Sequence, residues 1–175
     1  MNAAGRFEKV SLEEYIRAWE NAGLINRDEG HGQDRRKRLE SIWRDIRLPV
    51  RATGGSAGYD FFVPDSVCVS PGESVVIPTG VRAYIENGYF LMMVPRSGLG
   101  FKHGFRLENT VGIIDSDYYF ADNEGHIMAK FSVTSPLSLH PGDRFMQGIF
   151  VPFGETSNDH PLQPARRGGF GSTGK

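Results

Sequence analysis

The sequence predicts a mainly β fold with a short helical extension at its N-terminus. From about Arg51 onward, short runs of β-branched and aromatic residues alternate with turns that contain Gly and Pro, which is typical of antiparallel strands. The 175 residues include 22 Gly, 10 Pro and 12 Phe, which suits a single all-β body with aromatic packing. Residues 1–48 differ, because their apolar residues recur at helical intervals.

Two helices are predicted in this extension. Ser11 followed by Glu14 is a capping-box pattern that begins a helix, and Gly23 is a good stop. One face of this helix would carry Leu12, Tyr15, Ile16 and Trp19. A second helix is predicted over Asp34–Ile46, ended by Leu48-Pro49. We expect the two helices to form a hairpin that packs on the main body or on a neighbouring subunit.

The body is expected to consist of short strands separated by turns. The candidate strands are Tyr59–Val63, Val67–Val69, Ser74–Ile77, Val81–Glu86, Tyr89–Val94, Val111–Ile114, Ile127–Val133 and Arg144–Val151. Asn87-Gly88 lies between two apolar runs and is the strongest short hairpin signal. A short helical turn is predicted over Gly98–His103. The segment Glu155–Lys175 has almost no apolar content, and we expect it to be mobile when nothing is bound.

Charge and composition narrow the function classes. A net charge of −1 points to neither nucleic acid nor an anionic membrane as a partner. The basic run at 35–38 falls on a predicted helix with acidic residues nearby, which favours a solvated helix face over a nucleic-acid site. The single cysteine, Cys68, cannot form an internal disulfide and fits a reducing cytosol. No apolar run approaches the roughly 20 residues of a membrane helix, so a cytoplasmic protein is expected.

The stretch TVGIIDSDY, residues 110–118, carries the first candidate site. Its apolar run ends at Asp115, and Asp117 and Tyr118 follow. If the strand continued, the two carboxylates would point to one face and Tyr118 to the other. A carboxylate at a strand end can orient and deprotonate a water molecule. A solvated turn after a core strand is the alternative.

Three further segments carry polar groups. Arg96, Ser97 and Gly98 combine a guanidinium, a hydroxyl and turn amides, which suits a phosphate, although an ordinary turn also fits. Gln147 lies in an otherwise apolar strand, so its amide needs structural or ligand partners. The C-terminal RRGGFGSTGK looks like a phosphate clamp, but it lacks the spacing of a P-loop, and a disordered tail is the alternative.

Taken together and in order, five segments resemble the five motifs of the trimeric deoxyuridine triphosphatases (dUTPases). They are AGYD (57–60), PRSGLG (95–100), GIIDSDY (112–118), GDRFMQGIF (142–150) and GGFGSTG (168–174). The resemblance covers about Arg51 to Lys175. It implies a β jelly roll (β-clip) and a homotrimer whose three sites each draw on all three chains. It also implies Mg²⁺-dependent hydrolysis of dUTP to dUMP and pyrophosphate, which clears dUTP from the nucleotide pool and supplies dUMP for dTMP synthesis.

The resemblance implies a division of the chain into three parts. Residues 1–48 would be the helical extension, residues 49–155 the jelly-roll catalytic core, and residues 156–175 a flexible arm that closes a neighbouring active site. The run YYFADNEGH, residues 118–126, resembles a lengthened turn in the third motif.

The resemblance implies that Asp115 holds the water that attacks the α-phosphorus, while Asp117 is structural at the turn. Tyr118 would lie against the deoxyribose and exclude a 2′-hydroxyl. Uracil would be read mainly by backbone groups of the hairpin, with help from the Asn109 side chain. The residues implied in this reading are Asn109, Gly112, Ile113, Ile114 and Met128.

For the triphosphate, the resemblance implies that Arg96, Ser97 and Gly98 come from a second subunit and that Gln147 also reaches the phosphates. Asp60 would touch the water shell of Mg²⁺ rather than the ion.

The last motif would belong to the third subunit. Phe170 would stack on uracil, and Gly171, Ser172 and Thr173 would add amides and hydroxyls. Many family members have an arginine where this chain has Ala165, so the γ-phosphate would be held by Arg166 or Arg167. Arg166 is favoured because it lies nearer the usual position.

Two other functions remain open on the sequence alone. A dCTP deaminase shares the fold, although the tyrosine after IDSD and the GGFGSTG tail resemble the dUTPases. A dUTPase-like binding or regulatory protein is the second alternative, with the N-terminal helices as its contact surface.

Overall fold

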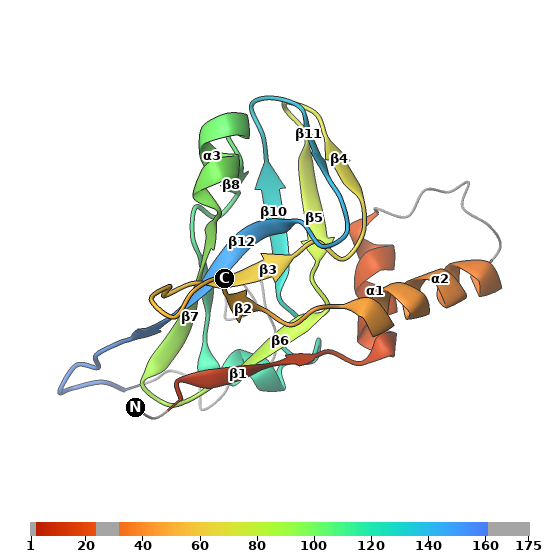
Figure 1. The fold of residues 1–175 in the computed structure, drawn as a ribbon. Helices are drawn as coiled ribbons and strands as arrows, with labels where there is room; N and C mark the ends of the chain where they lie inside the picture. Colours follow the sequence, from red (N-terminus) through yellow and green to blue (C-terminus); the bar gives the residue numbers. More distant parts are fainter. Residues whose placement is uncertain (1–2, 24–31, 161–175) are drawn as a thin grey trace.

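The computed structural model describes residues 3–23 and 32–160, and its fold is mainly β, as predicted (Figure 1). The largest sheet has the order β2-β3-β12-β7-β9, formed by Val50–Arg51, Tyr59–Phe62, Arg144–Pro152, Tyr89–Pro95 and Gly112–Ile114. A three-stranded sheet has the order β5-β10-β8, formed by Ser74–Pro78, Met128–Ser132 and Arg106–Leu107. All strand pairs in these sheets are antiparallel.

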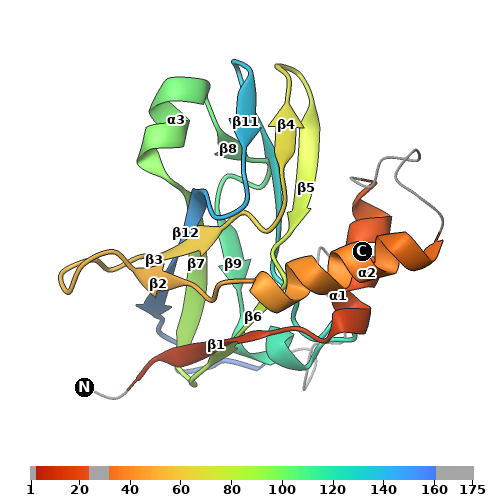
Figure 2. The same cartoon turned by 45° about the vertical axis from the view of Figure 1, so that its right-hand side comes forward.

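Two strand pairs and four helices complete the described chain. Strand β4, Val67–Val69, pairs with β11, Leu137–Leu139, and β1, Gly5–Lys9, pairs with β6, Val81–Ile85. The helices are α1 (Leu12–Ala22), α2 (Gly32–Asp45), α3 (Ser97–His103) and the 3₁₀ helix η1 (Ser116–Phe120). Figure 2 shows α3 at one end of the molecule, beside the tips of β4, β5 and β11, and away from α1 and α2. No helix among the described residues has both the length and the apolar character needed to cross a membrane.

Aromatic side chains fill the core between the two main sheets. Phe105 and Phe131 stack with their ring centroids 4.3 Å apart, and Phe145 of β12 meets Phe105 edge-on at 6.5 Å. Phe61 of β3 and Leu91 of β7 are also fully buried. The alternation of buried and exposed side chains along these strands therefore places one face of each sheet in a shared core.

The N-terminal extension packs on the body of its own chain and shares its core. Tyr15 and Trp19 of α1 and Leu39 of α2 belong to the buried cluster. Gly80 permits this approach, because it has a positive φ of 71° and a Cβ there would lie 2.2 Å from Ile46. Both helices confirm the sequence prediction, whereas β1 was not predicted.

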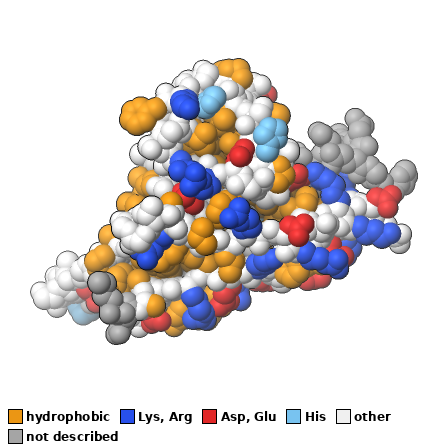
Figure 3. All heavy atoms as spheres, in the orientation of Figure 1, with side chains coloured by type: hydrophobic (Ala, Val, Ile, Leu, Met, Phe, Trp, Pro, Cys, Tyr) orange, Lys and Arg blue, Asp and Glu red, His pale blue; other side chains and the backbone are white. Residues whose placement is uncertain are grey.

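The basic run at 35–38 lies on α2, in a mixed charge environment. Arg36 is 3.2 Å from Glu13, and Arg38 forms an ion pair with Asp65. Figure 3 shows basic and acidic side chains interspersed on the face that carries α2. These pairs fit the interpretation of the run as a solvated helix face.

The Asn87-Gly88 turn forms, but the hairpin predicted from it is wrong. Gly88 has a φ of 82°, and the Tyr89 N–H donates to the Glu86 carbonyl at 3.2 Å. The strands on either side, however, enter different sheets: β6 pairs with β1, and β7 pairs with β12 and β9. Strand β1 pairs along β6 instead, and the Asn87-Gly88 turn gives no indication of this long-range pairing.

Two carboxylates attach the N-terminal segment to the body. Glu8 of β1 accepts the Tyr119 hydroxyl at 2.7 Å, and this bond is the main reason why the Glu8 pKa lies below its ordinary value of 4.5. Burial opposes ionisation of Glu124, but the Ser11 N–H and hydroxyl both donate to it, and its pKa is also lowered. Both carboxylates therefore favour the folded state in their ionised form.

We expect the melting temperature to fall as the pH drops below about 4.5, partly because these two carboxyls become protonated. Their pKa values are lower in the folded than in the unfolded protein. Their contribution to the free energy of unfolding is therefore complete at a pH above the unfolded-state pKa, and it is lost as the pH falls through the folded-state pKa. A double variant, Glu8→Gln with Glu124→Gln, should have a lower melting temperature near neutral pH. Its melting temperature should then fall less than that of the wild type when the pH is lowered. If calorimetry showed an equal fall of the melting temperature with pH in the variant and the wild type, this assignment would be contradicted.

Candidate active site

A pocket of about 390 Å³ opens beside β9 and β10. Its lining includes six of the residues that the sequence analysis assigned to the nucleoside: Asn109, Gly112, Ile113, Ile114, Tyr118 and Met128. Met93, Met146 and His126 also line it and were not predicted. The pocket is concave and largely apolar, with a few polar groups, as expected of a small-molecule site.

The backbone between Leu107 and Gly112 turns sharply at the pocket mouth. Thr110 has a positive φ of 65°, its N–H donates to the Leu107 carbonyl at 3.0 Å, and the Val111 N–H donates to the Asn109 carbonyl at 2.7 Å. A non-glycine residue in the left-handed region is uncommon, and such strain occurs often at binding sites. This turn brings the exposed Asn109 to the pocket that β9 lines.

The expectation that Asp115, Asp117 and Tyr118 alternate along a strand is wrong. Strand β9 ends at Ile114, and residues Ser116–Phe120 form the 3₁₀ helix η1. The Tyr118 N–H donates to the Asp115 carbonyl at 3.2 Å, which closes a turn between the two residues. The repeat of this stretch is therefore close to three residues, not two.

Tyr118 is buried with its ring in the pocket wall and its hydroxyl directed into the following turn. The side chain is 5% exposed, and its hydroxyl donates to the His126 carbonyl at 2.9 Å. The Asn123 amide donates to the same hydroxyl at 2.7 Å. Two hydrogen bonds thus fix the ring that the sequence analysis assigned to the sugar.

Asp115 lies at the border of the pocket. It is exposed, follows the pocket residue Ile114 directly, and lines a second hollow of about 150 Å³. Ile113 lines both hollows. The carboxylate is therefore placed beside this pocket and outside its apolar interior, where it is accessible to solvent.

Three residues assigned to the triphosphate and the metal meet in a separate cluster. Asp60 is 1% exposed and accepts the Gln147 amide at 2.9 Å, and Arg96 lies 3.4 Å from the same carboxylate oxygen. Arg144 donates to the other Asp60 oxygen at 3.2 Å and was not predicted. Asp60 thus anchors side chains from the second and fourth motifs. Ser97 and Gly98, which follow Arg96, are exposed at the start of α3.

The cluster and the pocket lie on opposite faces of the large sheet. Consecutive residues of a strand point to opposite faces. On β12, Met146 lines the 390 Å³ pocket, whereas Gln147 pairs in register with Asp60 and bonds to its side chain. Within one chain, the two groups of predicted residues therefore do not form a single cavity.

The described residues do not form a cage for a metal ion. Residues 3–23 and 32–160 contain no group of three or more His, Cys, Asp or Glu side chains that could hold one. Both Asp60 oxygens already face donors, and two of those are arginines. Direct coordination of a metal ion by Asp60 would have to compete with these donors. Arg166, Arg167, Phe170, Gly171, Ser172 and Thr173 lie outside the described residues.

Comparisons with known proteins agree on one family. The sequence profile described as dUTPase matches residues 44–174. The deoxyuridine 5′-triphosphate nucleotidohydrolase of Lactococcus lactis subsp. lactis is 42% identical over 133 residues, which cover 74% of this chain and 89% of the relative. The crystal structure of dUTPase from Streptococcus mutans is 41% identical with a TM-score of 0.58, covering 63% of this chain and 89% of that one. A mutant dUTPase from phage phi11 of Staphylococcus aureus, in which a structural Mg(II) ion is coordinated, shares the fold at 22% identity, with a TM-score of 0.56 over 67% of this chain and 91% of that one.

Proposed function

The chain belongs to the dUTPase family and hydrolyses dUTP, and we propose that it does so with a nucleoside pocket and a phosphate cluster contributed by different copies of the chain. One observation carries the assignment of the nucleoside pocket: six of the residues assigned to the nucleoside from the sequence line a single pocket of suitable size. The products are dUMP and pyrophosphate. The reaction would protect the cytoplasmic nucleotide pool and supply dUMP for dTMP synthesis.

In the proposed complex, the Tyr118 ring lies against the deoxyribose. Its hydroxyl is bonded to His126 and Asn123, so the ring cannot easily turn away, and a 2′-hydroxyl would clash with it. Uracil pairs with backbone groups of the Asn109–Ile114 segment and of Met128. A tight backbone pocket of this kind rejects a base with a 5-methyl group or with an amine in place of the 4-oxygen.

Asp115 activates the water in the proposed hydrolysis. Its ionised carboxylate accepts a proton from the water as the water oxygen attacks the α-phosphorus, and the bond from that phosphorus to the bridging oxygen breaks. Pyrophosphate leaves with the electron pair of that bond. The position of Asp115 next to the pocket, directly after Ile114, supports this role.

The phosphate cluster of a second subunit would receive the triphosphate. Arg96 offers a guanidinium, Ser97 and Gly98 offer the amides of a first helical turn, and Gln147 adds a side-chain amide. Asp60 holds Arg96 and Gln147 and so keeps their donors in place. The opposite facing of Met146 and Gln147 supports a site shared between chains, and a homotrimer meets that need.

Mg²⁺ would enter with dUTP, bound to the triphosphate. It would neutralise the charge that develops on the leaving pyrophosphate. Any contact with Asp60 would pass through water, because the carboxylate already faces Arg96, Arg144 and Gln147. The arm with Arg166 or Arg167, Phe170, Gly171 and Ser172 would close over the site from the third subunit.

The direct test is a product assay with dUTP and with dCTP. Pyrophosphate from dUTP alone, with Mg²⁺ present, is the expected result, and chelation of Mg²⁺ with EDTA should remove most of the turnover. Ammonia from dCTP would instead identify a deaminase. A folded protein that turns over neither nucleotide would favour a binding or regulatory role.

A further inference from the structure

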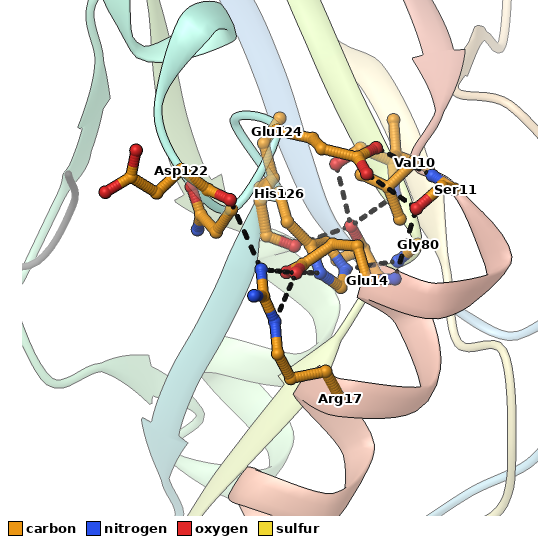
Figure 4. Close-up of polar contacts among 12 residues, drawn as sticks. Val10, Ser11, Glu14, Arg17, Gly80, Asp122, Glu124 and His126 are labelled. Atoms are coloured by element: carbon orange, nitrogen blue, oxygen red, sulfur yellow. Dashed lines mark hydrogen bonds and ion pairs between the residues drawn. The ribbon is translucent and has the colours of Figure 1, made fainter. Parts of the chain in front are cut away.

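Four side chains of the N-terminal segment contact the turn at residues 118–126, and they follow each other at three-residue intervals. Glu8 accepts the Tyr119 hydroxyl, Ser11 donates to Glu124, Glu14 meets His126 at 3.1 Å, and Arg17 donates to the Asp122 carbonyl at 3.3 Å. Figure 4 shows Ser11, Glu14 and Arg17 directed at this turn. Strand β1 and helix α1 therefore hold the turn along most of its length.

The capping box of α1 explains why Glu14 is available. The Ser11 hydroxyl accepts the Glu14 N–H at 3.1 Å, as the sequence predicted. In a complete capping box the Glu14 carboxylate would return to the Ser11 N–H, but here Glu124 accepts that N–H at 2.8 Å. The Glu14 carboxylate can therefore contact His126, and Glu124 replaces it at the Ser11 N–H. The cap of α1 thus joins the extension to the turn at residues 118–126.

The contact between Glu14 and His126 is fully enclosed. His126 is 0% exposed and Glu14 is 4% exposed. The Gly80 N–H donates to His126 Nε2 at 2.8 Å, so this nitrogen is an acceptor and carries no hydrogen. The hydrogen of the neutral ring is then on Nδ1, which donates to Glu14. Arg17 holds the second carboxylate oxygen of Glu14 through its Nε at 2.9 Å.

His126 connects this contact to the nucleoside pocket. Its carbonyl accepts the Tyr118 hydroxyl at 2.9 Å, its N–H donates to the Asn123 carbonyl at 3.0 Å, and it lines the pocket. Asn123 also donates to the Tyr118 hydroxyl. The orientation of the Tyr118 ring therefore depends on where His126 is held.

We propose that Glu14 is a positioning residue for the sugar side of the nucleoside pocket, acting through His126 on Tyr118. The N-terminal segment would then contribute to the preference for deoxyribose, although none of its residues from Glu8 to Arg17 lines the pocket. This inference rests on the proposed function of Tyr118. Without Glu14, the His126 Nδ1–H loses its buried acceptor, the ring and its backbone shift, and Tyr118 is held less firmly.

The test compares two adjacent glutamates of α1. Glu14→Ala should raise KM for dUTP about 10-fold and lower the preference for dUTP over UTP by about the same factor, with a smaller change in kcat. Asp115 lies outside the buried contact, which is why kcat should change less. Glu13→Ala is the matched control, because Glu13 is 73% exposed and forms an ion pair with Arg36 on the surface. Its KM and preference should stay within about twofold of the wild type.

Three further variants separate positioning from stability. Glu14→Gln keeps an oxygen acceptor for His126 and should retain most of the preference. Arg17→Ala loosens the carboxylate without removing it and should lower the preference less than Glu14→Ala; it serves as the test if Glu14→Ala does not fold. Leu39→Ala removes a fully buried side chain of α2 and should lower the melting temperature without changing the preference.

The result that would overturn the inference is a Glu14→Ala protein that melts lower but keeps the wild-type KM and preference. Tyr118→Phe provides a second test, because it removes the bond to the His126 carbonyl. If Glu14 acts through Tyr118, the two changes should reduce the preference less in combination than the product of their separate effects. Fully multiplicative effects would contradict the route through Tyr118. If the wild-type protein does not turn over dUTP, the proposed function is contradicted as well. If the wild type is active and Glu14→Ala keeps its KM and preference, only this inference is contradicted.

Discussion

Asp115→Asn is expected to lower kcat for dUTP by about 10²–10⁴-fold while leaving the affinity for dUTP nearly unchanged. The amide is close in size to the carboxylate but cannot take the proton of the attacking water. Asp115 is exposed at the end of β9 and lies outside the buried core, so the substitution should not disturb the fold. Single-turnover kinetics give the chemical step, and calorimetric titration of the inactive variant gives the affinity.

Asp117→Asn is the matched control for this experiment. Asp117 lies two residues further on, in the 3₁₀ helix, and the sequence analysis assigned it to the turn. Its kcat should stay within a few-fold of the wild type. Undiminished turnover in Asp115→Asn, or an equal loss in both variants, would remove Asp115 from the role of general base.

Truncation after Pro164 is expected to reduce kcat/KM for dUTP by about 100-fold or more and to leave the oligomer intact. The removed residues, 165–175, include the aromatic ring and the arginine that we propose the last motif contributes to the closed site. Light scattering after size exclusion measures the oligomer, and the pyrophosphate assay measures turnover.

Single variants then identify the phosphate arginine. Arg166→Ala should resemble the truncation more closely than Arg167→Ala does, because Arg166 lies nearer the position that the family uses. A truncated protein that dissociates into monomers would show that the arm is structural. Full activity after truncation would remove the arm from the site.

Local patterns predicted most of the elements. The helix from Leu12 and the strand Val67–Val69 were predicted correctly, because apolar periodicity and capping residues act over a few neighbours. Asn109–Ile114 and Tyr118, which are close in sequence, line one pocket, and their role in holding the nucleoside stays a prediction. That prediction came from the ordered motifs, because periodicity does not indicate which polar residues belong to one site.

Features that depend on long-range pairing were not predictable in this way. Strand β1 gains its partner 72 or more residues further along, where Lys9 meets Val81. Glu14 and His126 are 112 residues apart, and neither has a local signal for burial. The prediction that the strand continues through Asp117 was wrong, because a 3₁₀ helix follows Ile114. The alternation of side chains along a strand does not indicate where that strand ends.

The central claim is that the pocket beside β9 and β10 holds the deoxyuridine of dUTP with Asp115 facing the α-phosphorus. A crystal structure of the Asp115→Asn variant with dUTP and Mg²⁺ tests it most directly. We expect uracil against Asn109–Ile114 and Met128, the deoxyribose against Tyr118, and a water between residue 115 and the α-phosphorus. Nucleotide bound away from this pocket, or with its α-phosphate out of reach of residue 115, would contradict the claim.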